Sequence, residues 1–146
     1  MASGSQPFDM AKLTMKESAS VDALMEEYEW QNRVLLVFAP ETDNAALVEQ
    51  TNNLSGMGAG MRARDLVVWQ LVNNEPASVN GKLTSEISSQ PFYDYFSVKG
   101  SDFTVILLGK DGTTKLRQTQ PVTSHGLFSL IDAMPMRQRE MRERGR

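Results

Sequence analysis

Residues 33–40 read RVLLVFAP, which is apolar from Val34 to Ala39 and stops at a proline. A strand with one buried face alternates apolar and polar residues, and this run does not alternate, so it predicts a strand buried on both faces. Residues 66–72, LVVWQLV, repeat the pattern, and residues 47–57 between the two runs show helical spacing. Strand, helix and strand in this order predict a βαβ unit whose two strands are parallel.

A β-hairpin is the clearest pattern further along the chain. Residues 103–108 and 113–117 form two extended runs, and the Gly-Lys-Asp-Gly sequence at 109–112 supplies the turn between them. Residues 73–89, which precede the hairpin, are rich in Asn, Ser, Gly and Pro, and they predict a long surface excursion.

Three further helices are expected around these strands. Residues 21–28 show the apolar spacing of a short amphipathic helix. A second short helix opens at Pro91, because proline suits the first turn of a helix. Thr123 or Ser124 can cap a last helix, which Pro135 ends or kinks.

These elements predict one α/β domain at residues 18–136, between a flexible lead-in at 1–17 and a basic tail at 137–146. The tail holds five Arg and two Glu, and we expect a fraying, solvated helix end. An alternative is that it grips an acidic or phosphate-bearing partner. Its candidate binding residues are then Arg137, Arg139, Arg142 and Arg144.

The composition excludes several classes of function. The chain has 146 residues, 40% hydrophobic and 23% charged, with a formal net charge of -3, one His and no Cys. Without a thiolate there is no disulfide, no cysteine nucleophile and no dithiol redox chemistry, so thiol oxidoreductase and cysteine peroxidase activities are excluded. The mild acidic balance predicts no nucleic-acid partner, no apolar run is long enough to cross a bilayer, and we expect no cofactor and no metal site.

The order of elements resembles a thioredoxin-like domain with a helix in front. Thioredoxins place their redox loop after an apolar strand that ends in a Phe and small residues, as at residues 35–40 here. Counted from Phe38, the two redox cysteines would fall near Asp43 and Ala46, and the cis-proline would fall near Asp102. The resemblance therefore implies the fold but none of its redox chemistry.

A more specific resemblance is carried by residues 33–40, 64–68, 103–112, 115–117 and 131–141. In these stretches the chain resembles a cysteine-poor, peroxiredoxin-like domain family of unknown function, the DUDES group, which occurs in exported bacterial proteins and in animal sushi-repeat and related matrix proteins. The resemblance implies a thioredoxin-like fold, a periplasmic or secreted location and no established catalytic activity.

The loop Glu41, Thr42, Asp43 and Asn44 is the candidate binding site, because this fold places its functional groups where a parallel strand ends and a helix begins. A simpler interpretation is that Thr42 or Asp43 only caps that helix. Asp102 would add a second carboxylate if it faces the same loop.

Two other features have simpler explanations. Gly56, Gly58 and Gly60 follow a helix, whereas a phosphate-binding loop precedes one, so a flexible helix end is expected. His125 lies in the first turn of the last helix, where an exposed position is expected.

The sequence predicts a non-catalytic, thioredoxin- or peroxiredoxin-like domain that binds a protein partner through the loop at 41–44. The alternative is a cysteine-independent hydrolase or metal-assisted enzyme that uses Asp43 and Asp102, with His125 as a possible base. That alternative requires the three side chains to converge on one pocket.

Overall fold

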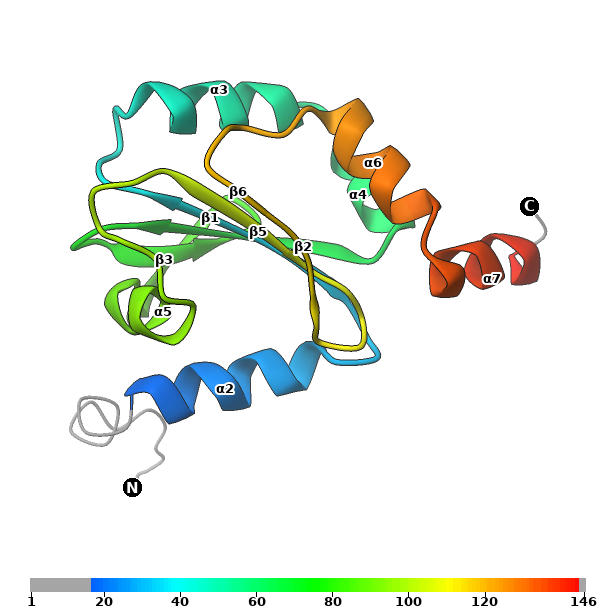
Figure 1. The fold of residues 1–146 in the computed structure, drawn as a ribbon, viewed down its shortest axis with the longest axis horizontal. Coiled ribbons are helices and arrows are strands. Elements are labelled where there is room, and N and C mark those ends of the chain that lie inside the picture. The colour runs from blue at the N-terminus through cyan, green and yellow to red at the C-terminus, as the bar shows by residue number, and fades with distance from the viewer. Residues whose placement is uncertain (1–16, 145–146) are drawn as a thin grey trace.

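The computed structural model describes residues 17–144, and its centre is a six-stranded sheet in the order β4-β3-β2-β1-β5-β6 (Figure 1). Strands β1 and β2 are parallel, and the other four neighbouring pairs are antiparallel. The expected mixed α/β class, the parallel pair and the hairpin are confirmed. The strands are β1 (Arg33–Ala39), β2 (Leu66–Val72), β3 (Pro76–Val79), β4 (Lys82–Ser88), β5 (Thr104–Leu108) and β6 (Thr114–Gln118).

Helices cover both faces of the sheet. Figure 1 shows α3 (Ala45–Leu54), α4 (Gly58–Ala63) and α6 (Ser124–Asp132) on one side. The opposite side carries α2 (Glu17–Tyr28) and α5 (Gln90–Tyr95). The last helix, α7 (Pro135–Glu143), extends beyond the end of the sheet. None of the helices among residues 17–144 combines the length and apolar character that crossing a membrane requires.

Strand β1 divides the core into two layers. All seven of its residues are buried. Leu35 and Val37 pack with the helices α3 and α6, whereas Leu36 and Phe38 pack with α2 and α5. Because side chains alternate along a strand, an unbroken apolar run is what a sheet covered on both faces requires.

The surface excursion predicted for residues 73–89 is wrong, because this segment forms the hairpin β3–β4 and widens the sheet by two strands. Its turn is Asn80-Gly81, and both residues have positive φ, 49° and 84°. A tight hairpin of this kind needs positive φ at both central positions, which Asn and Gly tolerate best. Asn-Gly was therefore a hairpin signal within a segment that otherwise looks like a loop.

The glycine-rich segment also differs from the expectation of a flexible helix end. Gly56, at φ 77°, follows the end of α3, and Gly58 opens the separate helix α4. Gly60 lies under the ring of Phe128, where an added Cβ would stand 2.7 Å from Cε2. The absence of a side chain at Gly60 is what lets α4 and α6 pack closely.

Candidate functional site

The predicted loop leaves β1 at its carboxyl end, and three of its four side chains are exposed. The fourth, Asn44, caps α3, because its Oδ1 accepts the N–H of Leu47 at 3.0 Å. The expectation that Thr42 or Asp43 provides this cap is therefore wrong. Within the described part of the chain, the side chains of Glu41, Thr42 and Asp43 make no hydrogen bond.

Asp102 lies at the same end of the sheet as this loop. It precedes β5, which runs antiparallel to β1 and pairs Thr104 with Phe38. Asp102 is exposed and lines a hollow of about 500 Å³ with Lys99 and Arg117 among its other walls. Asp43 does not line that hollow, so the two carboxylates share an end of the sheet but this hollow does not bring them together.

Arg117 links two of the segments that line this hollow. Its guanidinium donates to the carbonyl oxygens of Phe96 at 2.6 Å and Ser97 at 2.9 Å. Ser97 has a φ of 55°, in the region that residues other than glycine rarely adopt. The turn after α5 is thus tied to strand β6 beside Asp102.

His125 does not join the two carboxylates. It is exposed in the first turn of α6, just after Val122, whose backbone is bonded to Gln50 in the second half of α3. Asp43 instead precedes the first turn of that helix. Among residues 17–144 there is also no group of three or more His, Asp or Glu placed to hold a metal ion.

The opposite end of the sheet carries a group of ionic residues, here called the charge cluster. Its centre is the buried Arg33, whose Nη1 and Nη2 each donate to a different oxygen of Glu140, both at 3.2 Å. Lys110 Nζ donates to Glu140 Oε2 and to Asp65 Oδ2, each at 2.8 Å. The cluster comprises Arg33, Arg64, Asp65, Lys110, Asp132, Arg137, Glu140 and Arg144.

A second part of the charge cluster is centred on Asp132, at the end of α6. Arg64 donates to both of its oxygens, from Nε at 3.0 Å and Nη2 at 2.8 Å. Arg137 Nε donates to Oδ1 at 2.9 Å. Arg64 also lies over the ring of Phe128, 4.0 Å from its centre. These contacts hold α4, α6 and α7 together.

The charge cluster lowers the pKa of each of its carboxyl groups, which favours the ionised form. Burial alone would raise the pKa of Glu140, but hydrogen bonds and charges from Lys110 and Arg33 outweigh burial and lower it. In the same way, burial is outweighed by Lys110 and Arg144 at Asp65, and the pKa of this carboxyl is lowered. At Asp132, Arg64 and Arg137 outweigh burial and lower the pKa. Each carboxylate of the cluster is therefore paired with lysine or arginine side chains of the same cluster, and we call this arrangement an ionic clamp.

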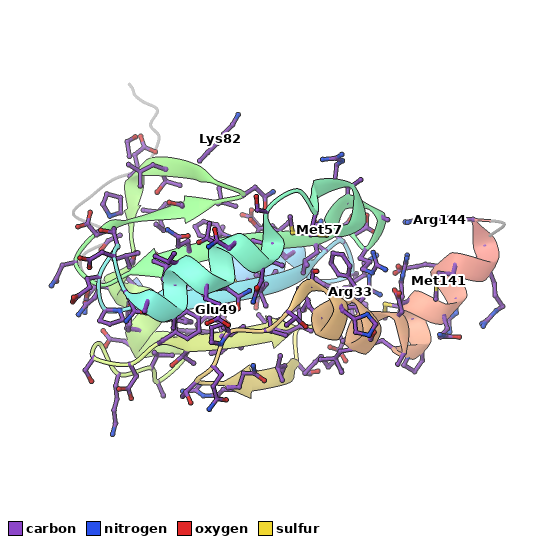
Figure 2. The ribbon with its side chains drawn as sticks, turned by 90° about the horizontal axis from the view of Figure 1, so that it is seen from above. Arg33, Glu49, Met57, Lys82, Met141 and Arg144 are labelled. Carbon is purple, nitrogen blue, oxygen red and sulfur yellow. The ribbon has the colours of Figure 1, made fainter. Side chains whose placement is uncertain are left out.

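The arginines of the predicted basic tail differ in their burial and in their contacts with this clamp. The expectation of a solvated end is wrong for Arg137, which is buried and donates to Asp132 and to the carbonyl oxygen of Ala63. Arg144 reaches back from the end of α7 to Ala63 and Asp65 (Figure 2). Arg139 and Arg142 have exposed side chains.

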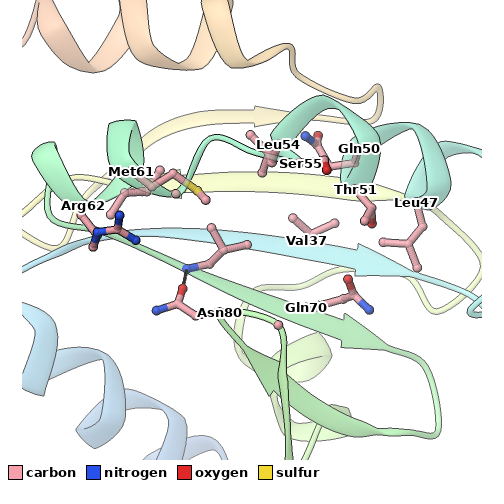
Figure 3. A pocket seen from close by; sticks show the side chains of 14 residues that line it. Val37, Leu47, Gln50, Thr51, Leu54, Ser55, Met61, Arg62, Gln70 and Asn80 are labelled. Atoms are coloured by element: carbon pink, nitrogen blue, oxygen red, sulfur yellow. Dashed lines mark hydrogen bonds between the residues drawn. The ribbon is translucent and has the colours of Figure 1, made fainter.

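A cavity that the sequence did not predict lies on the α3–α4 face of the sheet (Figure 3). Its volume is about 460 Å³, and it is bounded by the two helices, β1, β2 and the turn of the β3–β4 hairpin. The Asn-Gly pair could have indicated its outer wall, but the hollow itself depends on how far the helices stand from the strands.

Comparison with known proteins identifies relatives but no function. A family model described as "Domain of unknown function (DUF4174)" matches residues 24–140. The coiled-coil domain-containing protein 80 of Danio rerio is 28% identical over an alignment of 138 residues, which covers 84% of this chain and 16% of that protein.

Two sushi-repeat proteins are also similar to this chain. Sushi repeat-containing protein SRPX2 of Xenopus laevis is 25% identical, covering 84% of this chain and 27% of its own length. Sushi repeat-containing protein SRPX of Rattus norvegicus is 26% identical, and its alignment covers 95% of this chain and 31% of that protein. The expected resemblance to sushi-repeat proteins is confirmed, and the chain spans under a third of each of these relatives. No solved structure matches the chain.

Proposed function

Because the chain belongs to the family described as Domain of unknown function (DUF4174), we propose its function from its own geometry: a non-catalytic, protein-binding domain on a thioredoxin-like scaffold. The binding surface is the loop Glu41, Thr42, Asp43 and Asn44 together with Asp102. The partner is a protein whose contact surface is basic.

The connectivity supports the thioredoxin-like part of this proposal. A parallel pair, β1 and β2, is linked through helices, a further helix follows, and the hairpin β5–β6 leads into α6. The pairing of β5 beside β1 in the antiparallel sense also belongs to that arrangement. The helix α2 in front and the hairpin β3–β4 at the edge are additions to it.

The absence of cysteine supports a scaffold that binds without thiol chemistry. The chain holds no Cys, and the positions where the resemblance places the redox pair carry Asp43 and Ala46. A carboxylate and a methyl group cannot exchange disulfides or reduce a peroxide. A disulfide-reductase or peroxidase assay should therefore give only the background rate.

One observation carries the choice of surface. Glu41, Thr42 and Asp43 follow a strand that is buried along its whole length, yet their own side chains are exposed and do no capping work. When a partner binds exposed polar residues that are held by a rigid backbone, little backbone conformational entropy is lost. With Asp102 at the same end of the sheet, three carboxylates are available to a basic partner.

The relatives support a module that works as part of larger proteins. The chain corresponds to 16% of the coiled-coil domain-containing protein and to about 30% of the sushi-repeat proteins. Together with the family resemblance, this size relation supports a secreted or periplasmic binding module. Within the chain, we propose that residues 18–136 carry the binding surface and that Arg137 and Glu140 of the last helix stabilise this domain through the charge cluster.

The test removes three charges from the proposed surface. The triple variant Glu41→Gln, Asp43→Asn and Asp102→Asn is used as bait in a native extract beside the unchanged protein. A matched control neutralises three exposed carboxylates elsewhere, Glu49→Gln, Glu86→Gln and Glu143→Gln. We expect a partner that the unchanged protein and the control retain and the surface variant loses. Identical partners for all three proteins would refute the surface.

A further inference from the structure

The cavity beneath α3 and α4 is built like a small-molecule site. Its floor is apolar and buried, formed by Val37, Leu47 and Leu66. Half-buried apolar side chains line its walls, and its rim is exposed and polar. At about 460 Å³ it lies within the range of roughly 300–1,000 Å³ that is typical of ligand pockets. The wall residues are Leu54, Met61 and Val68, and the rim includes Thr51, Ser55, Arg62 and Asn80.

The walls of this cavity are fixed by internal hydrogen bonds. Asn80 Oδ1 accepts the N–H of Val68 at 2.9 Å, and the N–H of Asn80 donates to the carbonyl of Val68 at 2.7 Å (Figure 3). On the other side, the amide of Gln50 exchanges two hydrogen bonds with the backbone of Val122, at 2.9 and 2.8 Å. The hairpin turn and α3 are therefore both anchored, and the space between them is maintained.

Arg62 and Gln70 are two of the polar side chains at the cavity that have no side-chain partner among the described residues. Arg62 is the charged residue among those that line it, and its guanidinium extends over Gly58, where an added Cβ would lie 3.2 Å from Nη1. Within residues 17–144, Arg62 makes no hydrogen bond or ion pair, and the side-chain amide of Gln70 makes none either. Figure 3 shows these two residues toward opposite ends of the cavity.

The unpaired state of Arg62 contrasts with that of its neighbours. Arg64, two residues later, has its guanidinium engaged by Asp132, Gly60 and the ring of Phe128. Arg33 and Arg137 are held in the same charge cluster. A guanidinium can bind a carboxylate through two parallel hydrogen bonds. Of these four arginines, Arg62 is the one whose guanidinium forms no such bond to a described residue, and it lies at an apolar cavity.

We propose that this cavity binds a small aliphatic carboxylate. The carboxylate pairs with Arg62, and the hydrocarbon chain lies along Leu54, Met61 and Val68 toward Gln70. The apolar walls gain from covering the chain, and the single unpaired cation at the rim selects an anionic head. This site is separate from the protein-binding loop and does not depend on it.

The test is a methyl NMR titration with sodium octanoate, kept below the concentration at which it forms micelles. We expect shifts of the methyl groups of Leu47, Leu54, Met61 and Val68 that saturate with a single dissociation constant. Octanol, which has the same chain without the charge, should bind about tenfold or more weakly, because the charge-assisted bonds to Arg62 are lost.

Two variants and one control complete the experiment. Arg62→Gln should weaken octanoate binding about tenfold or more while leaving octanol unchanged, and Val68→Trp should abolish both by filling the cavity. Arg139→Gln, which removes an exposed arginine away from the cavity, should have no effect. Circular dichroism verifies folding, and Arg62→Gln is decisive because its side chain is exposed and unpaired.

Three results would overturn the proposal. One is an Arg62→Gln protein that binds octanoate as tightly as the unchanged protein does. Another is octanol binding as tight as octanoate binding. The third is a set of shifts that lies outside the cavity, for example on α7, which would indicate that octanoate is attracted to the exposed arginines there.

Discussion

Arg33 has the most constrained environment of any charged residue in the fold. Its side chain is 1% exposed, and a guanidinium cannot shed its proton at any ordinary pH. Glu140 compensates the charge through two hydrogen bonds, and the carbonyl of Arg64 accepts a third at 2.9 Å, while Nε has no partner. The stability of this end of the molecule therefore depends on one carboxylate from the last helix.

Glu140→Gln should lower the free energy of unfolding by about 3–5 kcal/mol at neutral pH, because it leaves a buried arginine without its counter-charge. Urea denaturation measures the change. Glu143→Gln, an exposed position on the same helix, is the control and should stay within about 0.5 kcal/mol of the unchanged protein. Equal stabilities of the two variants would mean that the Arg33–Glu140 pair contributes nothing.

Gly60→Ala should destabilise the protein by about 1–3 kcal/mol, because the new methyl group would overlap the ring of Phe128. That ring cannot easily move, since Arg64 lies against its face. Gly58→Ala is the matched control on the same helix, because its methyl group would meet only the mobile end of Arg62. Thermal unfolding should show a lower midpoint for Gly60→Ala alone, and a loss of the same size in both variants would disprove the packing argument.

At the scale of single elements, the hairpin β3–β4 is joined to the rest of the sheet by a short strand pairing. Its pairing with β2 is limited to Trp69 with Val79 and Gln70 with Ser78. The side chain of Asn80 adds a hydrogen bond to Val68, which lies one residue beyond that short ladder. One asparagine thus both forms the turn and attaches it to β2.

Replacing Asn80 in two ways separates these roles. Asn80→Gly keeps the positive φ and should cost about 1 kcal/mol for the lost hydrogen bond. Asn80→Ala loses the same bond and also strains a methyl-bearing residue at positive φ, so it should cost about 1 kcal/mol more. Chemical denaturation and amide exchange of Val68 check both. If the two variants were equally stable, the turn conformation would carry no cost.

The sequence of helix α7 does not indicate that this helix packs against the rest of the fold. Its residues are strongly polar, which is typical of a solvated helix end, and it has little apolar surface with which to pack. It is held instead by contacts with residues that are distant in sequence. Ion pairs join Glu140 to Arg33 and Arg144 to Asp65, which are 107 and 79 positions away, and Arg137 donates a hydrogen bond to the carbonyl of Ala63, 74 positions away. A polar helix can pack against a fold when charged residues of opposite sign on that fold pair with the charges of the helix.

For the molecule as a whole, the two proposed binding sites and the charge cluster occupy three separate places. The exposed acidic loop lies where β1 ends, the charge cluster lies where β1 begins, and the octanoate-sized cavity lies on one face between them. Because the charge cluster bonds its ionic groups to one another, it acts as structure, and the two binding proposals concern the other two places.

The stability of the whole molecule should fall in acid. The pKa values of Glu140, Asp65 and Asp132 are lowered in the folded state from ordinary values of 4.5 and 3.8. Asp111 joins them, since the backbone N–H of Thr113 lowers its pKa to about 2. A lowered pKa means that the folded state binds protons less readily than the unfolded state, so protonation favours unfolding.

This contribution is complete above about pH 5 and is lost progressively as the pH falls through 4 toward the lowered folded-state values. Urea denaturation between pH 7 and pH 3 should therefore show a steady loss of unfolding free energy below pH 5. Glu140→Gln should show a shallower decline, because one of the titrating groups is gone. A flat profile in the unchanged protein would contradict the ionic clamp.

The candidate site could be predicted only in part. The sequence indicated that the loop at 41–44 follows a buried strand, and the antiparallel pairing of β5 with β1 does bring Asp102 to the same end. It did not indicate which residue caps α3, because Thr42, Asp43 and Asn44 all have capping chemistry and only the backbone geometry selects Asn44. The cavity and Arg62 could not be found from residue patterns, since a void depends on the spacing of whole elements.

The sequence by itself determined the strands β1 and β2, the hairpin β5–β6 and the α/β class, because apolar period and turn chemistry act over a few neighbouring residues. The tertiary structure alone decided that Arg33 is buried and that Glu140 lies beside it from 107 residues away. It also decided that Arg62 lies at a cavity without a partner among residues 17–144. The physical reason is that counter-charges and voids arise between distant segments, and no local pattern encodes the distance at which two such segments meet.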